Sequence, residues 1–226
     1  MKILRGVAWG ALICALLLIA GCALLPSALH RLNPDIVYRG PKTDRTLYLT
    51  IDDGPSQSTG LILDVLKKHG VHATFFIITD HIEPVILQRS IAEGNQLANH
   101  MKTSASLSRL SDEQFHSEFL AADKALTKFE AVKLFRPPGG SISTERARFV
   151  ATQGYEIVAG TIFPLDHWLE NTHIIVALAK ALTIDGGIII LHDTNIRGPR
   201  TAAVLDELIP YLQHKGYRFE LLPEKK

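Results

Sequence analysis

Two adjacent carboxylates end the first strand-like segment of the chain. Residues 47–51 are rich in strand-forming types and lead directly into Asp52, Asp53 and a Gly-Pro turn. Parallel α/β folds build their sites at the carboxyl ends of strands, so both charges are expected at such an edge. Like charges this close are stable when a cation or a proton separates their roles. The pair therefore predicts one metal ligand and one base, with an Asx turn that closes the strand as the structural alternative.

Four later strand-like segments also end in polar or aromatic side chains. These side chains are His100, Arg136, Asp166 with Trp168, and His192 with Asp193. Each alone has a structural explanation, such as a helix N-cap for Asp193. In a parallel barrel the ends of all strands share one rim, so residues far apart in sequence converge there. Five clusters on one rim predict an active site.

The elements that would position these residues alternate regularly from Arg45 onward, which favours parallel βα units. Strands are predicted at 46–51, 73–78, 96–99, 133–136, 155–159, 187–191 and 217–221. Helices are predicted near 58–69, 84–93, 111–129, 143–153, 172–183 and 200–214. This pattern predicts an α/β fold, a distorted (β/α) barrel of about seven parallel strands. A doubly wound sheet is the alternative, but the glycine-rich motifs of its nucleotide-binding versions do not occur.

Size and composition narrow the class of protein further. The 226 residues suit one substantial domain. With 24 basic and 23 acidic residues the net charge is +1, which excludes the clustered basic excess that nucleic-acid binding requires. Cys14 and Cys22 are the only cysteines, and both precede the predicted domain, so its stability must come from its core and not from a disulfide. No obligate protein partner is evident.

The first residues have the layout of a secretory signal. Lys2 and Arg5 precede an apolar run at 7–20 that is short for a membrane span. The run ends in Leu-Ile-Ala-Gly-Cys at 18–22, which resembles the bacterial lipobox. Cleavage before Cys22 would leave an acylated cysteine, and several acyl chains hold a protein on a membrane durably. An uncleaved signal anchor is the alternative.

These features predict three parts of the chain. Residues 1–21 form a lipoprotein signal peptide, residues 22–44 a tether, and residues 45–222 the folded domain. The protein is expected to be exported in a bacterium and anchored to a membrane of the cell envelope through a lipid on Cys22. Ala23, in place of an aspartate, favours the outer membrane if the source is Gram-negative.

In the residues of its predicted folded domain the chain resembles the polysaccharide deacetylases of carbohydrate esterase family 4, which share the NodB homology domain. The resemblance covers residues 45–222 and depends on five motifs in order. They are Thr-Ile-Asp-Asp-Gly-Pro at 50–55, Asn-His at 99–100, Arg-Pro-Pro-Gly-Gly at 136–140, Asp-His-Trp at 166–168 and Leu-His-Asp at 191–193. The resemblance implies a distorted barrel, a divalent metal and removal of acetyl groups from N-acetylated sugars.

The resemblance also implies catalytic roles. Asp52 would be the general base, oriented by Arg136, and His192 would be the general acid, kept charged by Asp166. A backbone N–H near Gly139 would help to hold the oxyanion.

Metal and substrate residues follow from the same resemblance. Asp53 and His100 would bind the metal, for which zinc is the first choice and cobalt, manganese or magnesium are alternatives. The substrate slot would be formed by Pro138, Gly139, Trp168 and Leu191.

Three positions depart from the family pattern. The family usually has a second histidine four residues after His100, and this chain has Ser104 in that ligand position. A hydroxyl is a poorer zinc ligand than imidazole, so His81, His167 or water would have to complete the coordination, or catalysis has been lost. In addition, His167 separates the Asp and Trp of the fourth motif, and Gly139 stands where an aromatic residue is common.

The sequence therefore predicts a metal-dependent hydrolase that removes acetyl groups from an N-acetylated or O-acetylated polysaccharide, such as chitin oligomers or peptidoglycan. One alternative is a catalytically impaired glycan-binding lipoprotein of the envelope, motivated by Ser104. A second alternative is a hydrolase for another small amide or ester, motivated by the altered third and fourth motifs.

Overall fold

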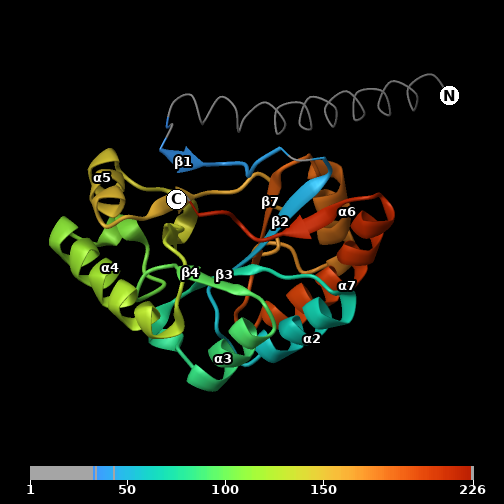
Figure 1. The fold of residues 1–226 in the computed structure, drawn as a ribbon, viewed down its shortest axis with the longest axis horizontal. Helices are drawn as coiled ribbons and strands as arrows, with labels where there is room; N and C mark the ends of the chain where they lie inside the picture. The colour runs from blue at the N-terminus through green and yellow to red at the C-terminus, as the bar shows by residue number, and fades with distance from the viewer. Residues whose placement is uncertain (1–32, 34, 43, 225–226) are drawn as a thin grey trace.

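A curved parallel sheet forms the centre of the protein (Figure 1). The computed structural model describes residues 33, 35–42 and 44–224. The strands are β1 (Ile36–Val37), β2 (Thr46–Asp52), β3 (Thr74–Ile77), β4 (Gln96–Asn99), β5 (Leu134–Phe135), β6 (Glu156–Val158), β7 (Gly187–His192) and β8 (Arg218–Glu220). They pair in the order β1-β6-β5-β4-β3-β2-β7, with β8 beside β2, and every pairing is parallel.

In the described part of the chain, six α-helices lie around the outside of the sheet (Figure 1). They are α2 (Thr59–His69), α3 (Pro84–Ala92), α4 (Asp112–Leu126), α5 (Thr144–Thr152), α6 (Thr172–Leu182) and α7 (Gly198–His214). The strongest sequence signal for a boundary is at α4, where Ser111 and Gln114 form a reciprocal capping box. Within the described ranges, none of these helices has the length and apolar character that spanning a membrane requires.

The expected distorted barrel is confirmed, although regular strand pairing does not close it. The strands at the two ends of the sheet order are β1 and β7. An isolated parallel bridge between Ile162 and Ile189 joins the segment after β6 to β7. The strand predicted at 133–136 is reduced to two residues in β5: Leu134 pairs with β6 alone, and Phe135 pairs with both β4 and β6.

Part of the segment predicted as a tether packs against the sheet. Strand β1 pairs with Ile157 and Val158 of β6, and the Gly40 N–H donates to the Gly186 carbonyl. The predicted signal peptide, the lipidation residue Cys22 and the tether as far as residue 32 lie outside the described residues. The packed region therefore begins before the predicted boundary at Arg45.

The two-residue period of the strands separates core residues from site residues. In β2, Leu49 and Ile51 join the main core between sheet and helices, so Asp52 faces the opposite side. In β7, Leu191 joins the same core, while Ile190 and His192 line a cavity at the carboxyl end of the sheet. Alternation along two adjacent strands therefore brings Asp52 and His192 to one side.

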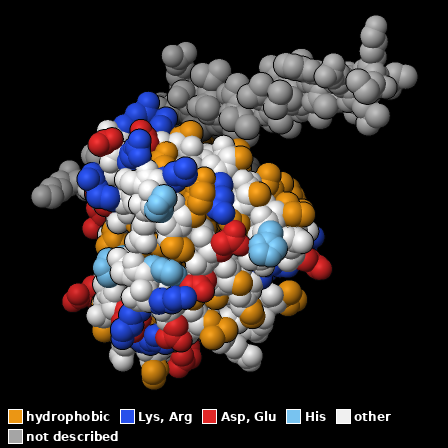
Figure 2. Space-filling view, turned by 90° about the vertical axis from the view of Figure 1, so that its right-hand side faces the viewer, with side chains coloured by type: hydrophobic (Ala, Val, Ile, Leu, Met, Phe, Trp, Pro, Cys, Tyr) orange, Lys and Arg blue, Asp and Glu red, His pale blue; other side chains and the backbone are white. Residues whose placement is uncertain are grey.

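The outer surface carries no large region of one charge on the face shown in Figure 2. There, acidic and basic side chains are intermixed and hydrophobic side chains are dispersed between them. This distribution agrees with the nearly neutral composition.

An aromatic cluster under α4 gives a test of the packing. Phe119 is fully buried, and its ring centroid lies 5.1 Å from that of Phe135 and 5.0 Å from that of Tyr155. We expect Phe119→Ala to lower the free energy of unfolding by about 3–5 kcal/mol, because the truncation leaves a cavity. Leu120→Ala on the exposed face of the same helix should cost less than about 0.5 kcal/mol. Urea denaturation measures both, and equal losses would contradict this packing.

Candidate active site

A cavity of about 580 Å³ opens at the carboxyl end of the sheet. The ionisable side chains that line it are Asp52, Asp53, His100, Arg136, His167, His192 and Arg197. They come from the ends of five different segments that are far apart in sequence. The rim predicted from the sequence is therefore a real cavity with acids, bases and cations in it.

Asp52 is held by a buried ion pair. Arg136 Nη1 donates to Asp52 Oδ1 at 2.6 Å and to Thr50 Oγ1 at 2.8 Å, and both charged side chains are almost fully buried. Arg136 also lies with its guanidinium carbon 4.1 Å from the centre of the Phe76 ring. A buried carboxylate held in this way has a fixed direction, and a carboxylate is a group that can accept a proton from a molecule in the cavity.

Asp53 and His100 form a second pair beside it. His100 Nδ1 lies 2.7 Å from the Arg136 carbonyl oxygen, which fixes the proton on Nδ1 and leaves the Nε2 lone pair free. Nε2 is 3.5 Å from Asp53 Oδ1. Burial raises the pKa of the Asp53 carboxyl, but a hydrogen bond and the charge from His100 in its protonated form, with the charges of His192 and Arg197, lower it more.

This pair fits a divalent metal in its donor chemistry. Two ligands that bind one ion at about 2.0–2.2 Å with tetrahedral angles lie about 3.4 Å apart, close to the separation observed. A carboxylate and a neutral imidazole are both zinc ligands, and the carbonyl behind His100 is the kind of support that metal-binding histidines receive. Asp53 and His100 would hold the metal.

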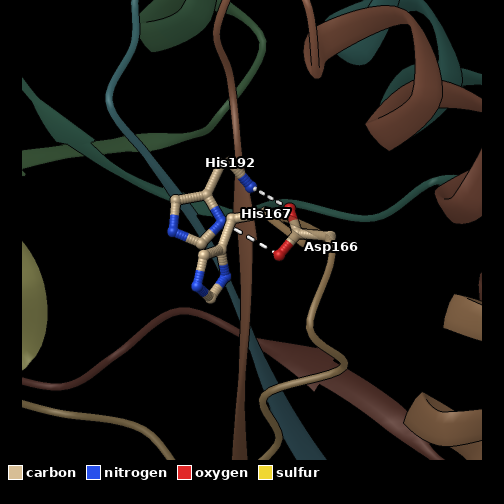
Figure 3. A group of neighbouring side chains, drawn as sticks. All are labelled: Asp166, His167 and His192. Atoms are coloured by element: carbon tan, nitrogen blue, oxygen red, sulfur yellow. Dashed lines mark hydrogen bonds and ion pairs between the residues drawn. The ribbon is translucent and has the colours of Figure 1, made fainter. Parts of the chain in front are cut away.

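His192 and Asp166 form the third pair (Figure 3). The backbone N–H of His192 donates to Asp166 Oδ2 at 2.9 Å, and His192 Nδ1 donates to Asp166 Oδ1 at 2.9 Å. Burial lowers the pKa of His192, but the hydrogen bond and charge of Asp166 raise it to a net value above the ordinary 6.5. A protonated imidazole oriented toward the cavity can donate a proton.

His167 packs beside this pair. Its ring centroid is 5.5 Å from that of His192 and 4.0 Å from that of Trp168, and Figure 3 shows its ring next to that of His192. Burial lowers the pKa of His167, and the nearby charge of His192 lowers it further. His167 is therefore a neutral neighbour of the acid pair in neutral solution.

A smaller cavity of about 490 Å³ lies next to this one, and Asp53 lines both cavities. Asp193 stands in its wall, where its carboxylate accepts hydrogen bonds from Ser56 and Thr59, both at 2.5 Å. The Asp193 N–H also donates to the Asp52 carbonyl at 2.7 Å. Asp193 thus fixes the turn that carries both aspartates to the end of β7.

Comparison with known proteins agrees with this geometry. The family model "Polysaccharide deacetylase" matches residues 39–158. A chitooligosaccharide deacetylase of Bradyrhizobium is 33% identical over 197 residues, which cover 80% of this chain and 90% of that protein. The chain belongs to the polysaccharide deacetylase family.

Two further relatives of this family support the assignment. A peptidoglycan-N-acetylglucosamine deacetylase of Bacillus cereus is 30% identical over 194 residues, covering 82% of this chain and 70% of that protein. The crystal structure of a peptidoglycan N-acetylglucosamine deacetylase superposes with a TM-score of 0.79 at 28% identity, covering 84% of this chain and 91% of that one.

Most of the residues that the sequence analysis selected meet in the cavity of this family's fold. Asp52, Asp53, His100, Arg136, Gly139, Trp168 and His192 line it, and Asp166 supports His192 from behind. Trp168 is 71% exposed, so it forms an open wall of the cavity rather than a closed slot.

Three selected residues lie elsewhere. Leu191 is fully buried in the main core, because it points to the helix side of β7; its neighbour Ile190 lines the cavity instead. Pro138 is buried in a short 3₁₀ turn, and Pro137 takes the lining position. Ser104 is exposed and is not among the residues that line either cavity.

The segment that carries Ser104 explains its position. The family pattern of ligands four residues apart fits a helix, but residues 101–106 are irregular here, and Met101 has a positive φ of 76°. A spacing of four residues therefore does not bring Ser104 over His100.

Among the described residues, neither histidine suggested as a replacement forms a group of three close ligand atoms with Asp53 and His100. His81 Nδ1 is 3.2 Å from the backbone oxygen of Asp53 and lines the smaller cavity. Among the described residues, the one group of three histidine, cysteine or carboxylate ligands within 4.8 Å of one another is Asp166, His167 and His192 (Figure 3). His167 therefore joins the acid pair and not the Asp53–His100 pair.

Sequence reasoning missed several cavity residues, among them Arg197 and Tyr38. Arg197 precedes α7, and its Nη1 lies 3.8 Å from Asp53 Oδ2. Tyr38 comes from the segment interpreted as a tether. The signal for Arg197 was its position a few residues after the fifth motif, on the loop that leaves the rim.

The effect of Asp166 on the pKa of the His192 imidazole can be measured by titration. We expect Asp166→Asn to lower the pKa of His192, because burial then acts without the opposing carboxylate. In the folded protein the raised pKa means that the pair stabilises the fold at low pH, and this contribution disappears as the pH rises through the folded-state pKa. NMR titration of the imidazole measures the shift.

The matched control is Asp206→Asn on α7, which removes an exposed carboxylate that pairs with Lys68 and His69. It should leave the His192 titration unchanged. An unchanged pKa in Asp166→Asn would show that Asp166 does not keep His192 charged.

Proposed function

We propose that the protein is a metal-dependent deacetylase of N-acetylated polysaccharides. The observation that supports this most directly is that a carboxylate base, an imidazole acid and a carboxylate–imidazole metal pair line one cavity. The family of the chain and the names of its relatives agree with that chemistry.

The base side of the reaction uses Asp52 and Arg136. A divalent cation held by Asp53 and His100 would supply Lewis-acid chemistry, by polarising the acetamide carbonyl and making water more acidic. Asp52 takes the proton of the attacking water, while its ion pair with Arg136 keeps the carboxylate directed into the cavity. The backbone at Gly139 lines the cavity, where an N–H would stabilise the developing oxyanion.

The acid side of the reaction uses His192 and Asp166. Cleavage of an amide C–N bond requires a proton on the departing amine. His192 has Nδ1 engaged by Asp166, so Nε2 is the atom that donates the proton. Its raised pKa keeps the imidazole protonated to a higher pH than an isolated histidine.

The substrate class is a glycan with N-acetyl groups. The relatives are named as deacetylases of peptidoglycan N-acetylglucosamine and of chitooligosaccharides. The broadly exposed indole of Trp168 offers an apolar surface on which the face of a sugar ring could rest. This supports N-acetylglucosamine-containing polymers over small amides.

The cellular place of this reaction is the bacterial envelope. The predicted signal peptide and the lipid on Cys22 would export the domain and tether it to a membrane, where cell-wall glycan is accessible. Globomycin, which blocks lipoprotein signal cleavage, should raise the apparent mass of the protein if Cys22 is lipidated, and Cys22→Ala should abolish that response.

Acetate release tests the proposed activity. The full-length protein in detergent should release acetate from N-acetylglucosamine tetramers, and chelation should stop the reaction until zinc, cobalt, manganese or magnesium is restored. Asp52→Asn and His192→Asn should each lower kcat by about 10²–10⁴-fold.

The control is His173→Asn, which changes an exposed histidine on α6 and should keep full activity. A folded protein that releases no acetate from N-acetylated or O-acetylated glycans with any metal would overturn the proposal. If it still bound glycan after chelation, the glycan-binding lipoprotein motivated by Ser104 would be the correct alternative.

Measuring metal affinity tests which residues bind the metal, independently of catalytic activity. We expect His100→Ala to weaken zinc binding by more than tenfold, because it removes an imidazole ligand with a fixed Nε2. Ser104→Ala should leave the affinity unchanged, because Ser104 is exposed outside both cavities. Isothermal titration of zinc into the metal-free protein measures both, and a loss of affinity in Ser104→Ala would restore Ser104 as a ligand.

A further inference from the structure

The two arginines in the main cavity differ in what they bind. All the nitrogen atoms of the Arg136 guanidinium have partners: Nη1 donates to Asp52 and Thr50, and Nε and Nη2 donate to the carbonyls of Val158 and Ala159. Arg136 is 3% exposed and uses four of its five N–H groups in these bonds. Arg136 is a structural cation.

Arg197 has its donors available. Within the described part of the chain, the one charged partner of its guanidinium is Asp53 Oδ2, at 3.8 Å, which is beyond hydrogen-bond distance. Its side chain is 32% exposed and lines the cavity. A guanidinium with five N–H groups and no hydrogen-bond acceptor is a ready site for an anion.

The backbone of Arg197 is nevertheless fixed. Its N–H donates to Thr194 Oγ1 at 3.1 Å, and its carbonyl accepts from the Thr201 N–H at 2.8 Å. The next residue, Gly198, packs so closely that a Cβ there would lie 2.4 Å from Ser58 Cβ and 2.9 Å from Asp193 Oδ1. The head group is therefore free while its attachment point is held at the mouth of the cavity.

Asp53 cannot satisfy Arg197 when it serves His100 and a metal. The carboxylate carries one negative charge, and its other oxygen already faces His100 Nε2. A divalent cation on that carboxylate leaves Arg197 with its charge unbalanced by any described carboxylate within 4 Å. The unbalanced charge attracts an anion on the bound molecule.

An exposed aromatic side chain on the cavity wall indicates what kind of molecule would carry that anion. Trp168 is 71% exposed and lines the cavity. An exposed indole suits the apolar face of a sugar ring, and a guanidinium suits a carboxylate, which it can bind with two parallel hydrogen bonds.

We infer that Arg197 is a carboxylate-binding position that selects glycans in which the sugar next to the reacting N-acetyl sugar carries an acidic substituent. The inference rests on the proposed function for the position of the reacting sugar. It separates peptidoglycan, in which alternate sugars carry a lactyl carboxylate, from neutral chitin oligomers. Arg197 acts in binding and is not a group that transfers protons.

Matched glycans test this inference. The full-length protein is given N-acetylglucosamine tetramers or peptide-free peptidoglycan strands of similar length, with the metal restored. The wild type should have the lower KM on the acidic strands, and Arg197→Gln should raise that KM about tenfold while changing the KM on the neutral tetramer less than twofold. Raising the salt concentration should weaken wild-type binding of the acidic strands only.

Two further variants complete the design. Arg197→Lys keeps the charge but loses the planar fork, so it should recover only part of the lost affinity. Arg148→Gln removes an exposed positive charge on α5, outside both cavities, and should change neither KM. Equal KM changes on the two glycans in Arg197→Gln, or wild-type preference for the neutral tetramer, would overturn the inference.

Glycan binding to the metal-loaded protein, measured by calorimetry, keeps the two proposals apart. If the wild type releases no acetate from these or other acetylated glycans with any metal, the proposed deacetylase is wrong. Arg197 is then judged by affinity alone: a tenfold loss for the acidic strands in Arg197→Gln supports the carboxylate position, and no selective loss refutes it.

Discussion

The buried Arg136–Asp52 ion pair is the interaction on which the rest of the site depends. Burying two charges is stabilising only when each is paired and fully hydrogen-bonded, and Arg136 meets this condition by binding Asp52, Thr50 and two carbonyl groups at the end of β6. It thereby joins three strands. Its own carbonyl accepts from His100, so the same residue sets the direction of the Asp52 carboxylate and the tautomer of the His100 imidazole.

Much of this arrangement could be predicted from the sequence because two periodicities determine it. Alternating strand and helix segments predicted the parallel sheet, and the polar residues directly after the strands predicted the rim. Asp52, His100, Arg136 and His192 meet as expected because each stands within one residue of the end of a parallel strand. Among the described residues, the one strand that was missed is β1, which has two residues and no hydrophobic period to detect.

The rest depended on side-chain direction and loop conformation, which motifs do not contain. Leu191 and His192 are neighbours in one motif, yet a strand sends them to opposite faces, and Leu191 enters the core. The positive φ of Met101 turns the chain away from a helix, so the four-residue spacing no longer places Ser104 on the same face as His100. Arg197 lies on a loop, and its distance from Asp53 depends on how Gly198 packs against Ser58.

The charges around Asp53 link the proposed metal and the proposed acidic substrate. Asp53 stands between His100 and Arg197, so a divalent cation on this carboxylate brings a second positive charge close to the guanidinium. A substrate carboxylate on Arg197 relieves that repulsion, and the metal in turn frees Arg197 from its partial attraction to Asp53. Because linkage between two binding events is reciprocal, each ligand then strengthens the binding of the other. If Asp53 and His100 hold a divalent cation, binding of an acidic substrate would thus raise the affinity of the site for that cation.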